Sequence, residues 1–537
     1  MYNGLKEYIR FLEAKGELRR IPEFTDPVLE IACATDIESK KPGGGKALLF
    51  ENTGTAFPVL TNMMGSEARI RYALGVDALE AVGPQIDALL AQVLAPKKGL
   101  RDKLRMLPLL NRAAAWMPRI RKGPAPCQES VQYAAQLSQL PVLQCWPQDG
   151  GRFITLPLVH TVSPVTGIRN VGMYRMQVLD DATTGMHWHP HKTGAKHLSE
   201  STHRLPVAVC LGGDPVYSYA ATAPLPEGID EYLLAGFLRG KPVELVKCFT
   251  QELLVPADCD FVIEGYVQKS EDPFMEGPFG DHTGFYSLED LYPKFHVTCI
   301  THRLDAVYPA TVVGIPPMED KYIQEATEKI FLSPIRLAIA PEIEDLYLPE
   351  EGVGHNFAVV RIRKQYEGQA FKVANALWGA GQMMFNKFLL VVDEEIDIRD
   401  QDRVLEAVCR NVDVPNDLLF SRGPLDVLDH TSPEPGFGGK LCIDATRKKQ
   451  AFPHRKLEDV VQVQYDAEEQ HADRYRKLWL LGANCDPLRD SRVDGRLFLD
   501  ATSKKDKPGF HRRWPDIVTH DPALVKRMKE RLKDGIR

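Results

Sequence analysis

The chain has 537 residues, of which 44% are hydrophobic and 26% charged, a composition typical of a globular protein with about three or four domains. Its net charge of −7 argues against general nucleic-acid binding, and no apolar run approaches the roughly 20 residues of a membrane-spanning helix. The N-terminus lacks a signal-peptide pattern and the ten scattered cysteines form no CxxC pair, so we expect a cytoplasmic protein with reduced thiols.

Residues 1–125 are predicted to form a small α/β domain. Apolar residues recur at helical spacing up to a stop at Gly16, and Asp26-Pro27 is a typical opening of a second helix toward Ser39. Strand-like segments at 47–50 and 58–62 follow.

A basic stretch at 97–122 stands out in this domain. Nine basic residues face the single acid Asp102 and alternate with apolar residues. Such a stretch either packs as a helix with a solvated basic face or lies on an anionic membrane, and Pro108 and Pro118 weaken the membrane interpretation. The basic residues are Lys97, Lys98, Arg101, Lys103, Arg105, Arg112, Arg119, Arg121 and Lys122.

Residues 126–318 are rich in short strands separated by turn signals. This density predicts a barrel or closed sheet, a shape that encloses ligands. The predicted strands are 153–162, 169–179, 206–211, 242–249, 261–267, 294–302 and 310–314.

Strands and helices alternate over residues 319–460, which predicts a C-terminal α/β layer domain. Residues 461–537 are charged and helical in pattern, and we expect a helical arm that contacts a neighbouring subunit. The predicted fold class is therefore α/β, in an α+β multidomain arrangement.

The loop Glu276–Gly284 carries two acids five residues apart, and neither helix nor strand suits its glycines and proline. A tight loop would bring Glu276 and Asp281 toward one point and drive their pKa values apart, as an acid/base site requires. The alternative is a solvated acidic turn.

Three histidines at alternate positions, His187, His189 and His191, would share one face of a strand and suggest a zinc site. Pro190 disfavours a regular strand there, and no HExxH partner occurs. Gly43-Gly44-Gly45-Lys46 lacks P-loop spacing and no GxGxxG follows a strand, so kinase-type and Rossmann dehydrogenase functions lose support.

Five motifs occur in an order that resembles the UbiD-type decarboxylases, and the resemblance covers nearly the whole chain. They are Asn170-Val171-Gly172-Met173-Tyr174-Arg175, Trp188 with His191, Asp230-Glu231-Tyr232, Glu276-Gly277-Pro278-Phe279-Gly280-Asp281, and Gly439-Lys440 ahead of Ile443-Asp444-Ala445-Thr446. The resemblance implies an N-terminal α/β domain, a central flavin-binding split β-barrel and a C-terminal α/β domain. It also implies prenylated FMN as cofactor, made by a flavin prenyltransferase.

The resemblance assigns roles by position. Asn170, His191 and Glu231 correspond to ligands of a divalent cation, Mn2+ or Mg2+, which such a mixed donor set suits. K+ accompanies this cation in the family. The flavin-contacting positions are Met173, Tyr174, Arg175, His187, Trp188, His189, Lys192, Thr193 and, more weakly, Lys440.

Arg175, Glu276 and Asp281 correspond to the family's catalytic triad, with Arg175 orienting the substrate carboxylate, Asp281 donating a proton and Glu276 linking them. Because Asn170 and Arg175 are five residues apart, a regular strand would point them to opposite faces. Either a bulge near Gly172 or side chains that reach opposite sides of the same flavin would then be needed.

The resulting hypothesis is a reversible, non-oxidative decarboxylase of a hydroxybenzoate- or naphthoate-type acid, working in quinone biosynthesis as a homodimer or homohexamer. The ubiquinone-pathway decarboxylase of polyprenyl-hydroxybenzoate is the alternative within the family. A zinc hydrolase using His187, His189 and His191 and a non-catalytic subunit of a decarboxylase complex are the alternatives from other classes.

Overall fold

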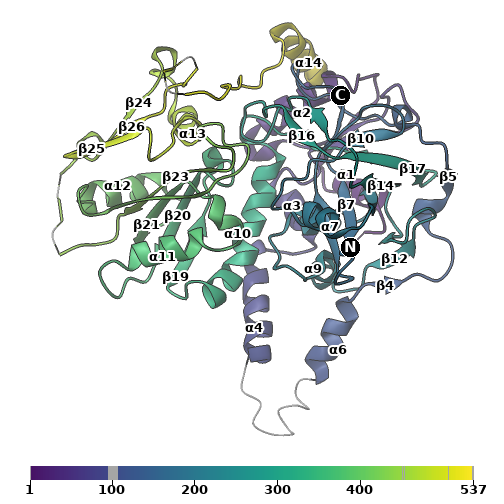
Figure 1. The fold of residues 1–537 in the computed structure, drawn as a ribbon, viewed down its shortest axis with the longest axis horizontal. Coiled ribbons are helices and arrows are strands. Elements are labelled where there is room, and N and C mark those ends of the chain that lie inside the picture. Colours follow the sequence, from purple (N-terminus) through teal and green to yellow (C-terminus); the bar gives the residue numbers. More distant parts are fainter. Residues whose placement is uncertain are drawn as a thin grey trace. The chain divides into compact units, whose positions relative to one another are not determined.

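The structure is a computed structural model that describes residues 2–94, 107–449, 451–452, 454–505, 507–508 and 510–534 (Figure 1). The chain divides into two compact units. The first comprises Met1–Ala81, Ala88–Ile323 and Ile517–Arg537, and the second comprises Val82–Asp87 and Gln324–Asp516.

The first unit begins with the predicted α/β elements. Helix α1 buries the predicted apolar stripe of Leu5, Tyr8, Ile9 and Leu12. Strands β1 and β2 pair in parallel, β3 joins antiparallel, and the later strand β18 joins β3 in parallel. The bounds are α1 Leu5–Ala14, β1 Leu18–Ile21, α2 Glu30–Ser39, β2 Ala47–Phe50, β3 Val59–Thr61, α3 Glu67–Leu74, α4 Val82–Leu94 and β18 Tyr308–Pro309.

A large antiparallel sheet forms the centre of the first unit. Its strand order is β10-β17-β14-β11-β7-β8, and β5 pairs with the far end of β17. Among the described residues no pairing joins β8 to β10, so the expectation of a closed sheet is wrong and the ladder is open. The bounds are β5 Ser130–Gln132, β7 Leu158–Val162, β8 Arg169–Met173, β10 Thr183–Gly185, β11 Arg204–Leu211, β14 Phe261–Gln268 and β17 Lys294–His302.

Two predicted strands differ from the expectation. Strand β12 lies in the predicted segment 242–249 but pairs with β13 and β4 rather than with the large sheet. The strand predicted at 310–314 is not formed, and the strand before it, β18, ends at Pro309 and belongs to the N-terminal sheet. Two two-stranded sheets, β6 with β9 and β15 with β16, lie outside the large sheet. The bounds are β4 Arg119–Ile120, β6 Phe153–Ile154, β9 Met176–Gln177, β12 Glu244–Lys247, β13 Leu254–Pro256, β15 Phe274–Glu276 and β16 Asp290–Tyr292.

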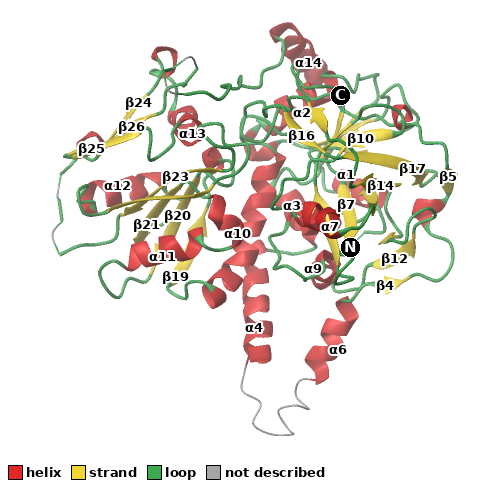
Figure 2. Ribbon diagram, viewed as in Figure 1, coloured by secondary structure: helices red, strands yellow, loops and turns green. Residues whose placement is uncertain are grey.

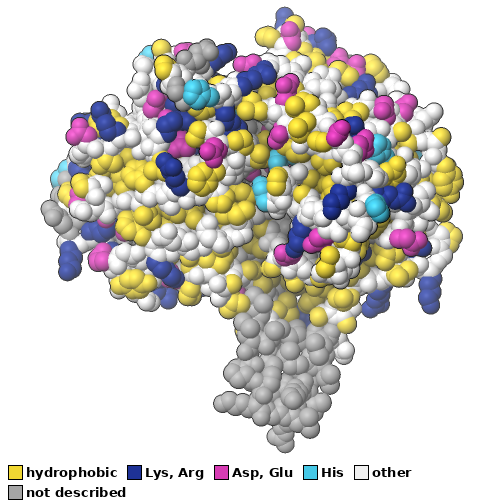
Figure 3. Space-filling model, in the orientation of Figure 1, with side chains coloured by type: hydrophobic (Ala, Val, Ile, Leu, Met, Phe, Trp, Pro, Cys, Tyr) yellow, Lys and Arg dark blue, Asp and Glu magenta, His cyan; other side chains and the backbone are white. Residues whose placement is uncertain are grey.

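Four helices complete this part of the first unit: α6 Leu107–Trp116, α7 Thr193–Glu200, α8 Val216–Thr222 and α9 Glu231–Arg239. Much of the predicted basic stretch, including Lys97 to Arg105, lies outside the described residues. On the face shown in Figure 3, basic and acidic side chains are interspersed. No described helix is long and apolar enough to span a membrane.

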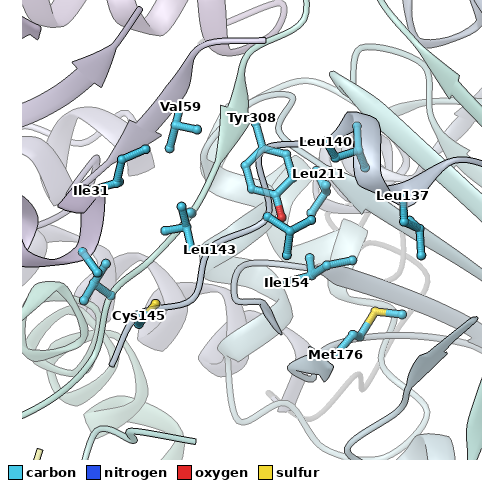
Figure 4. Close-up of a cluster of buried hydrophobic side chains, with 14 of the residues drawn as sticks. Ile31, Val59, Leu137, Leu140, Leu143, Cys145, Ile154, Met176, Leu211 and Tyr308 are labelled. Carbon is cyan, nitrogen blue, oxygen red and sulfur yellow. The ribbon is translucent and has the colours of Figure 1, made fainter. Parts of the chain in front are cut away.

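One hydrophobic core joins the N-terminal sheet to the central sheet. Ile31 and Val59 come from the N-terminal elements, Leu211 comes from the central sheet and Ile154 comes from β6. Figure 4 shows Tyr308 between the first two side chains and the last two. Burial of this apolar surface, at about 25 cal/mol per Å², is what holds the two sheets as one unit.

The second unit is an α/β layer structure, as predicted (Figure 2). Its sheet has the order β19-β20-β21-β23-β22, with β20, β21 and β23 parallel and antiparallel strands at both edges. Apolar residues of α11 pack on one face of the sheet and those of α12 on the other. The bounds are α10 Glu319–Ala338, β19 Ile343–Tyr347, β20 Phe357–Ile362, α11 Gln369–Trp378, β21 Phe388–Asp393, α12 Gln401–Asn411, β22 Leu418–Pro424 and β23 Phe437–Asp444.

Residues 461–537 differ from the expected helical arm. They contain a three-stranded sheet, β24-β26-β25, as well as two helices, because the short alternating runs at Val461–Gln464 and Arg496–Asp500 pair with each other in parallel. Helix α14 packs against α2 of the same chain, within the first unit. The bounds are β24 Val461–Gln464, α13 Arg474–Asn484, β25 Ser491–Asp494, β26 Arg496–Asp500 and α14 Pro522–Asp534.

Candidate active site

The acidic loop folds as tightly as the sequence predicts. Glu276 ends β15, and the next residue, Gly277, approaches Gly150 so closely that a Cβ on Gly277 would lie 2.7 Å from the Gly150 Cα. The Gly150 N–H donates to the Pro278 carbonyl over 2.7 Å. Only glycine permits this contact between two backbones, and it holds the start of the loop in place.

Arg175 reaches the loop because its strand is interrupted. Strand β8 ends at Met173 and β9 starts at Met176, so Tyr174 and Arg175 lie between two ladders. The pairing of β7 with β8 is continuous, so the bulge near Gly172, one of the two predicted arrangements, is not formed. Gly172 has a different role: a Cβ there would lie 2.4 Å from the Tyr174 ring, so only glycine lets that ring fold back over its own strand.

The structure brings the three predicted catalytic residues together. The Arg175 guanidinium donates to Glu276 Oε1 from Nε over 2.9 Å and from Nη2 over 2.6 Å, and Nη1 donates to Asp281 Oδ2. Nη2 also donates to Ser287 Oγ over 3.1 Å. The side chains of the triad are at most 10% exposed. One buried cation therefore bridges two buried carboxylates.

The electrostatics of the triad favour its charged form. Burial alone would raise the pKa of both acids, but the positive charge of Arg175 outweighs it and holds the pKa of Glu276 and of Asp281 below the ordinary range. The backbone N–H of His282 and its ring Nδ1–H both donate hydrogen bonds to Asp281 Oδ1, and these bonds also lower the pKa of Asp281. In this arrangement both carboxylates are ionised.

His187 extends the cluster. Its Nδ1–H donates to Glu276 Oε1 over 2.8 Å, and its ring packs against Tyr292 with ring centres 4.3 Å apart. Burial and the nearby Arg175 charge lower the pKa of His187, which keeps the imidazole neutral. Glu276 Oε2 is buried and has no hydrogen-bond partner among the described residues. This oxygen is available to a bound ligand.

Glu231, one of the predicted cation ligands, accepts a hydrogen bond from the backbone next to Asn170, another of them. The Val171 N–H, next to Asn170, donates to Glu231 Oε2 over 2.9 Å, and Glu231 is the first residue of α9. Burial raises the pKa of Glu231 to about 7, although the Val171 N–H and the Arg169 charge act to lower it. His191 lies in the turn before α7, a helix that packs against β8. A carboxylate, an amide and an imidazole in this setting fit a divalent cation.

The three-histidine zinc site is not formed. Residues 186–189 are not a strand, so the alternation that would align the histidines is absent. The rings of His187 and His189 are nearly perpendicular, and no group of three His, Cys, Asp or Glu side chains within the described ranges has an arrangement able to hold a metal ion. The zinc-hydrolase alternative therefore has no site in this part of the chain.

Three of the predicted flavin-contacting positions, Trp188, Lys192 and Thr193, line two adjoining cavities of the first unit. A cavity of about 650 Å³ is lined by His191, Lys192 and Thr193, which open helix α7. Trp188 lines a second cavity of about 300 Å³. Backbone N–H groups at a helix start favour anions, so these residues fit a phosphate group.

Other predicted flavin contacts include Tyr174 and His189 of the first unit and Lys440 of the second unit. Tyr174 and Trp188 pack edge to face, and His189 Nδ1 lies 3.4 Å from the Tyr292 hydroxyl. Lys440 lies on β23 of the second unit, where its Nζ donates to two backbone carbonyls and burial lowers its pKa to about 7. Its role as a flavin contact stays a prediction.

Sequence reasoning missed three residues that hold the acidic loop. Ser287 belongs to none of the motifs that the sequence shows. Its Oγ nevertheless accepts hydrogen bonds from Arg175 and from the Phe279 N–H. Asp149 accepts the Gly280 N–H over 2.7 Å, and Trp146 packs against Gly280. The run Trp146-Pro147-Gln148-Asp149-Gly150-Gly151 has the composition of a tight turn, and that composition was the available signal.

Comparison with known proteins identifies the family. Models of the N-terminal, central Rift-related and C-terminal domains of 3-octaprenyl-4-hydroxybenzoate carboxy-lyase match residues 9–89, 119–316 and 321–445. The chain belongs to the UbiD family. The predicted family and enzyme class, a carboxy-lyase, are confirmed.

Relatives and solved structures agree with this membership. Uncharacterized proteins of Aquifex aeolicus and Archaeoglobus fulgidus are 48% and 45% identical over 83% and 87% of this chain, and cover 92% and 96% of their own length. The UbiD-class enzyme HmfF from Pelotomaculum thermopropionicum, in complex with FMN, is 28% identical with a TM-score of 0.70 over 84% of this chain and 95% of its own. Vanillic acid decarboxylase from Sedimentibacter hydroxybenzoicus is 27% identical with a TM-score of 0.73 over 85% of this chain and 95% of its own.

Proposed function

We propose that this protein is a prenylated-FMN-dependent decarboxylase of an aromatic carboxylic acid, acting reversibly and without net oxidation. The observation that carries the proposal is the buried cluster in which Arg175 bridges Glu276 and Asp281. A buried arginine with two carboxylates is costly to assemble, and such groups gather where a reaction uses them.

The proposed chemistry begins with the substrate carboxylate at Arg175. A guanidinium binds a carboxylate through paired hydrogen bonds, so an incoming aromatic acid competes with Asp281 for Nη1. Once Asp281 loses this partner, burial raises its pKa, and the carboxylate takes up a proton from water. Substrate binding thus prepares the proton donor.

Loss of CO2 breaks the bond between the ring and its carboxylate and leaves an electron pair on the ring carbon. When bound, prenylated FMN supplies the electron sink that no side chain provides. Asp281 then delivers its proton to that carbon, which forms the new C–H bond. Glu276 holds Arg175 in position throughout, and its second oxygen, Oε2, is available to the ligand.

Some of the residues that would hold the cofactor line the larger cavity, and others lie on β8 and α9. Lys192 and Thr193, at the start of α7, would bind its phosphate, and Asn170, His191 and Glu231 would bind Mn2+ or Mg2+ beside it. K+ is proposed as the companion ion. These assignments rest on the donor chemistry of the residues and on HmfF, which is described in complex with FMN.

The substrate proposal is an aromatic acid of the hydroxybenzoate or naphthoate type, in quinone biosynthesis. Support comes from the likeness to vanillic acid decarboxylase, whose name states an aromatic acid. A flavin prenyltransferase is the proposed cofactor supplier, and a homodimer or homohexamer the proposed assembly.

The test uses protein co-expressed with a flavin prenyltransferase. Mass spectrometry of the released cofactor should show prenylated FMN, and a panel of aromatic acids should include one that releases CO2. Arg175→Ala and Asp281→Asn should lose this activity, while Glu289→Gln, an exposed acid of the same segment, should keep it. Activity that survives both first variants would overturn the proposed roles.

A further inference from the structure

The C-terminal segment of the first unit pairs with the acidic loop. Ile517 forms an antiparallel bridge with Phe285, and the Val518 N–H donates to the Gly284 carbonyl over 3.0 Å. Val518 is buried within the hydrophobic core of the unit. Residues 517–520, which we name the strap, therefore bond to the backbone at Gly284 and Phe285, three and four residues after Asp281.

The strap also reaches the loop through Trp146. A Cβ on Gly280 would lie 2.1 Å from the Trp146 ring, so loop and ring are in direct contact. The His520 ring stacks on the same indole, with centres 4.2 Å apart and planes 25° apart. The Trp146 Nε1–H donates to the Val313 carbonyl over 2.9 Å, which helps to hold the indole in place.

His520 contacts Trp146 through the face of its ring and not through its ring nitrogens. Both of its nitrogens are buried, and neither has a hydrogen-bond partner in the part of the chain that the structure describes. Ring nitrogens that are buried without partners lose their interactions with water, and stacking on Trp146 offsets part of this cost. This observation points to a role that depends on ring shape rather than on proton transfer.

Helix α14 anchors the strap two residues further on. Its Arg527 pairs with Glu30 over 2.8 Å, and Arg531 donates to the Phe24 carbonyl over 2.7 Å. Leu524, Met528 and Leu532 of the helix lie in the hydrophobic core. The strap is thus held at its far end by a packed helix and at its near end by the acidic loop.

We propose that the strap is a positioning element of the active site, with His520 acting through Trp146 to set the place of Gly280 and hence of Asp281. The strap lies beyond residue 445, where the family match ends, so it adds a contact to the site from outside the matched domains. The expected effect of the strap on kcat rests on the proposed function. Its expected effect on the position of the acidic loop does not depend on any reaction.

The first test compares two substitutions of His520 in the flavin-loaded enzyme. His520→Ala removes the stacked ring and should lower kcat by about 10- to 100-fold with a smaller change in KM, because a shift of about 1 Å in a catalytic group has this effect. His520→Phe keeps the ring and should restore kcat to within about threefold of wild type. Equal loss in both variants would overturn the stacking role.

The second test addresses the backbone bond. Val518→Pro removes the N–H that donates to Gly284, whereas Thr519→Pro, at an exposed neighbouring position, leaves that N–H in place. Amide hydrogen exchange of residues 280–287 should quicken about tenfold in Val518→Pro and His520→Ala, and remain close to wild type in Thr519→Pro and His520→Phe.

The exchange measurement separates this inference from the proposed function. If the wild-type protein turns over no aromatic acid, the proposed function fails. Amide hydrogen exchange of residues 280–287 still shows whether the strap positions the loop. If exchange and kcat of His520→Ala and Val518→Pro match wild type, the strap does not position the loop.

Discussion

Removal of the Arg175 guanidinium should destabilise the first unit measurably, even without substrate or cofactor. Arg175→Ala deletes four hydrogen bonds and leaves Glu276 and Asp281 as two buried carboxylates without their cation. Removing one partner of a buried ion pair costs about 3–5 kcal/mol. For the roughly 340 residues of the first unit, the unfolding entropy is about 0.7 kcal/mol/K, so Tm should fall by about 4–7 °C.

The loss should depend on pH in a defined direction. In wild type, Arg175 holds the pKa of both acids below the ordinary value, so their contribution to stability is present above about pH 4 and is lost as pH falls through the native pKa values. In Arg175→Ala, burial dominates and raises both pKa values, so the variant loses stability as pH rises from about 4. The Tm difference should therefore be larger at pH 8 than at pH 5.

Differential scanning fluorimetry across this pH range measures the effect. The matched control is Arg20→Ala, since Arg20 also bonds two carboxylates, those of Glu13 and Glu51, but on the surface. Exposed pairs contribute at most about 1 kcal/mol, so its Tm should change by no more than about 1–2 °C. If both variants shift Tm equally at every pH, the buried triad is not formed as described.

Three further predictions concern the surroundings of the triad. Gly280→Ala places a methyl group against Trp146 and should reduce turnover by about 100-fold with little change in far-UV circular dichroism, and unchanged turnover would show that the contact is not tight. Glu231→Gln removes the only carboxylate of the proposed cation site and should leave the purified protein without stoichiometric Mn2+ or Mg2+ by elemental analysis, whereas retained metal would exclude this site. Tyr232→Phe deletes the buried hydrogen bond to His160, 2.5 Å long, and should cost about 1–3 kcal/mol in denaturant unfolding, so equal midpoints would contradict the contact.

The sequence predicted single helices and strands better than it predicted which strands pair with one another. The stripe from Leu5 to Leu12 forms the predicted helix because helical periodicity is a local property. The segment 242–249 also contains its predicted strand, but that strand joins a small sheet with β4 and β13, since nothing in a strand's own pattern specifies its neighbours. The sequence pattern likewise could not show which strands pair at the two edges of the central sheet, and for this reason a closed sheet was expected where the sheet is open.

The candidate site divides in the same way. Arg175, Glu276 and Asp281 were predictable because they lie in motifs, and the tight loop followed from glycine and proline chemistry. The interruption of the strand at Tyr174 and Arg175 was not predictable, because it depends on two separate pairings of β8 and β9. The strap was missed because a charged, helical tail carries no signal for the loop it meets.

The most direct test of the central claim is decarboxylation in deuterated water by the flavin-loaded protein, followed by mass spectrometry of the product. The account predicts one deuterium at the ring carbon that held the carboxylate in wild type, and loss of product formation in Asp281→Asn. A flavin-loaded wild type that decarboxylates no aromatic acid, or an Asp281→Asn variant that labels its product as fast as wild type, would contradict it.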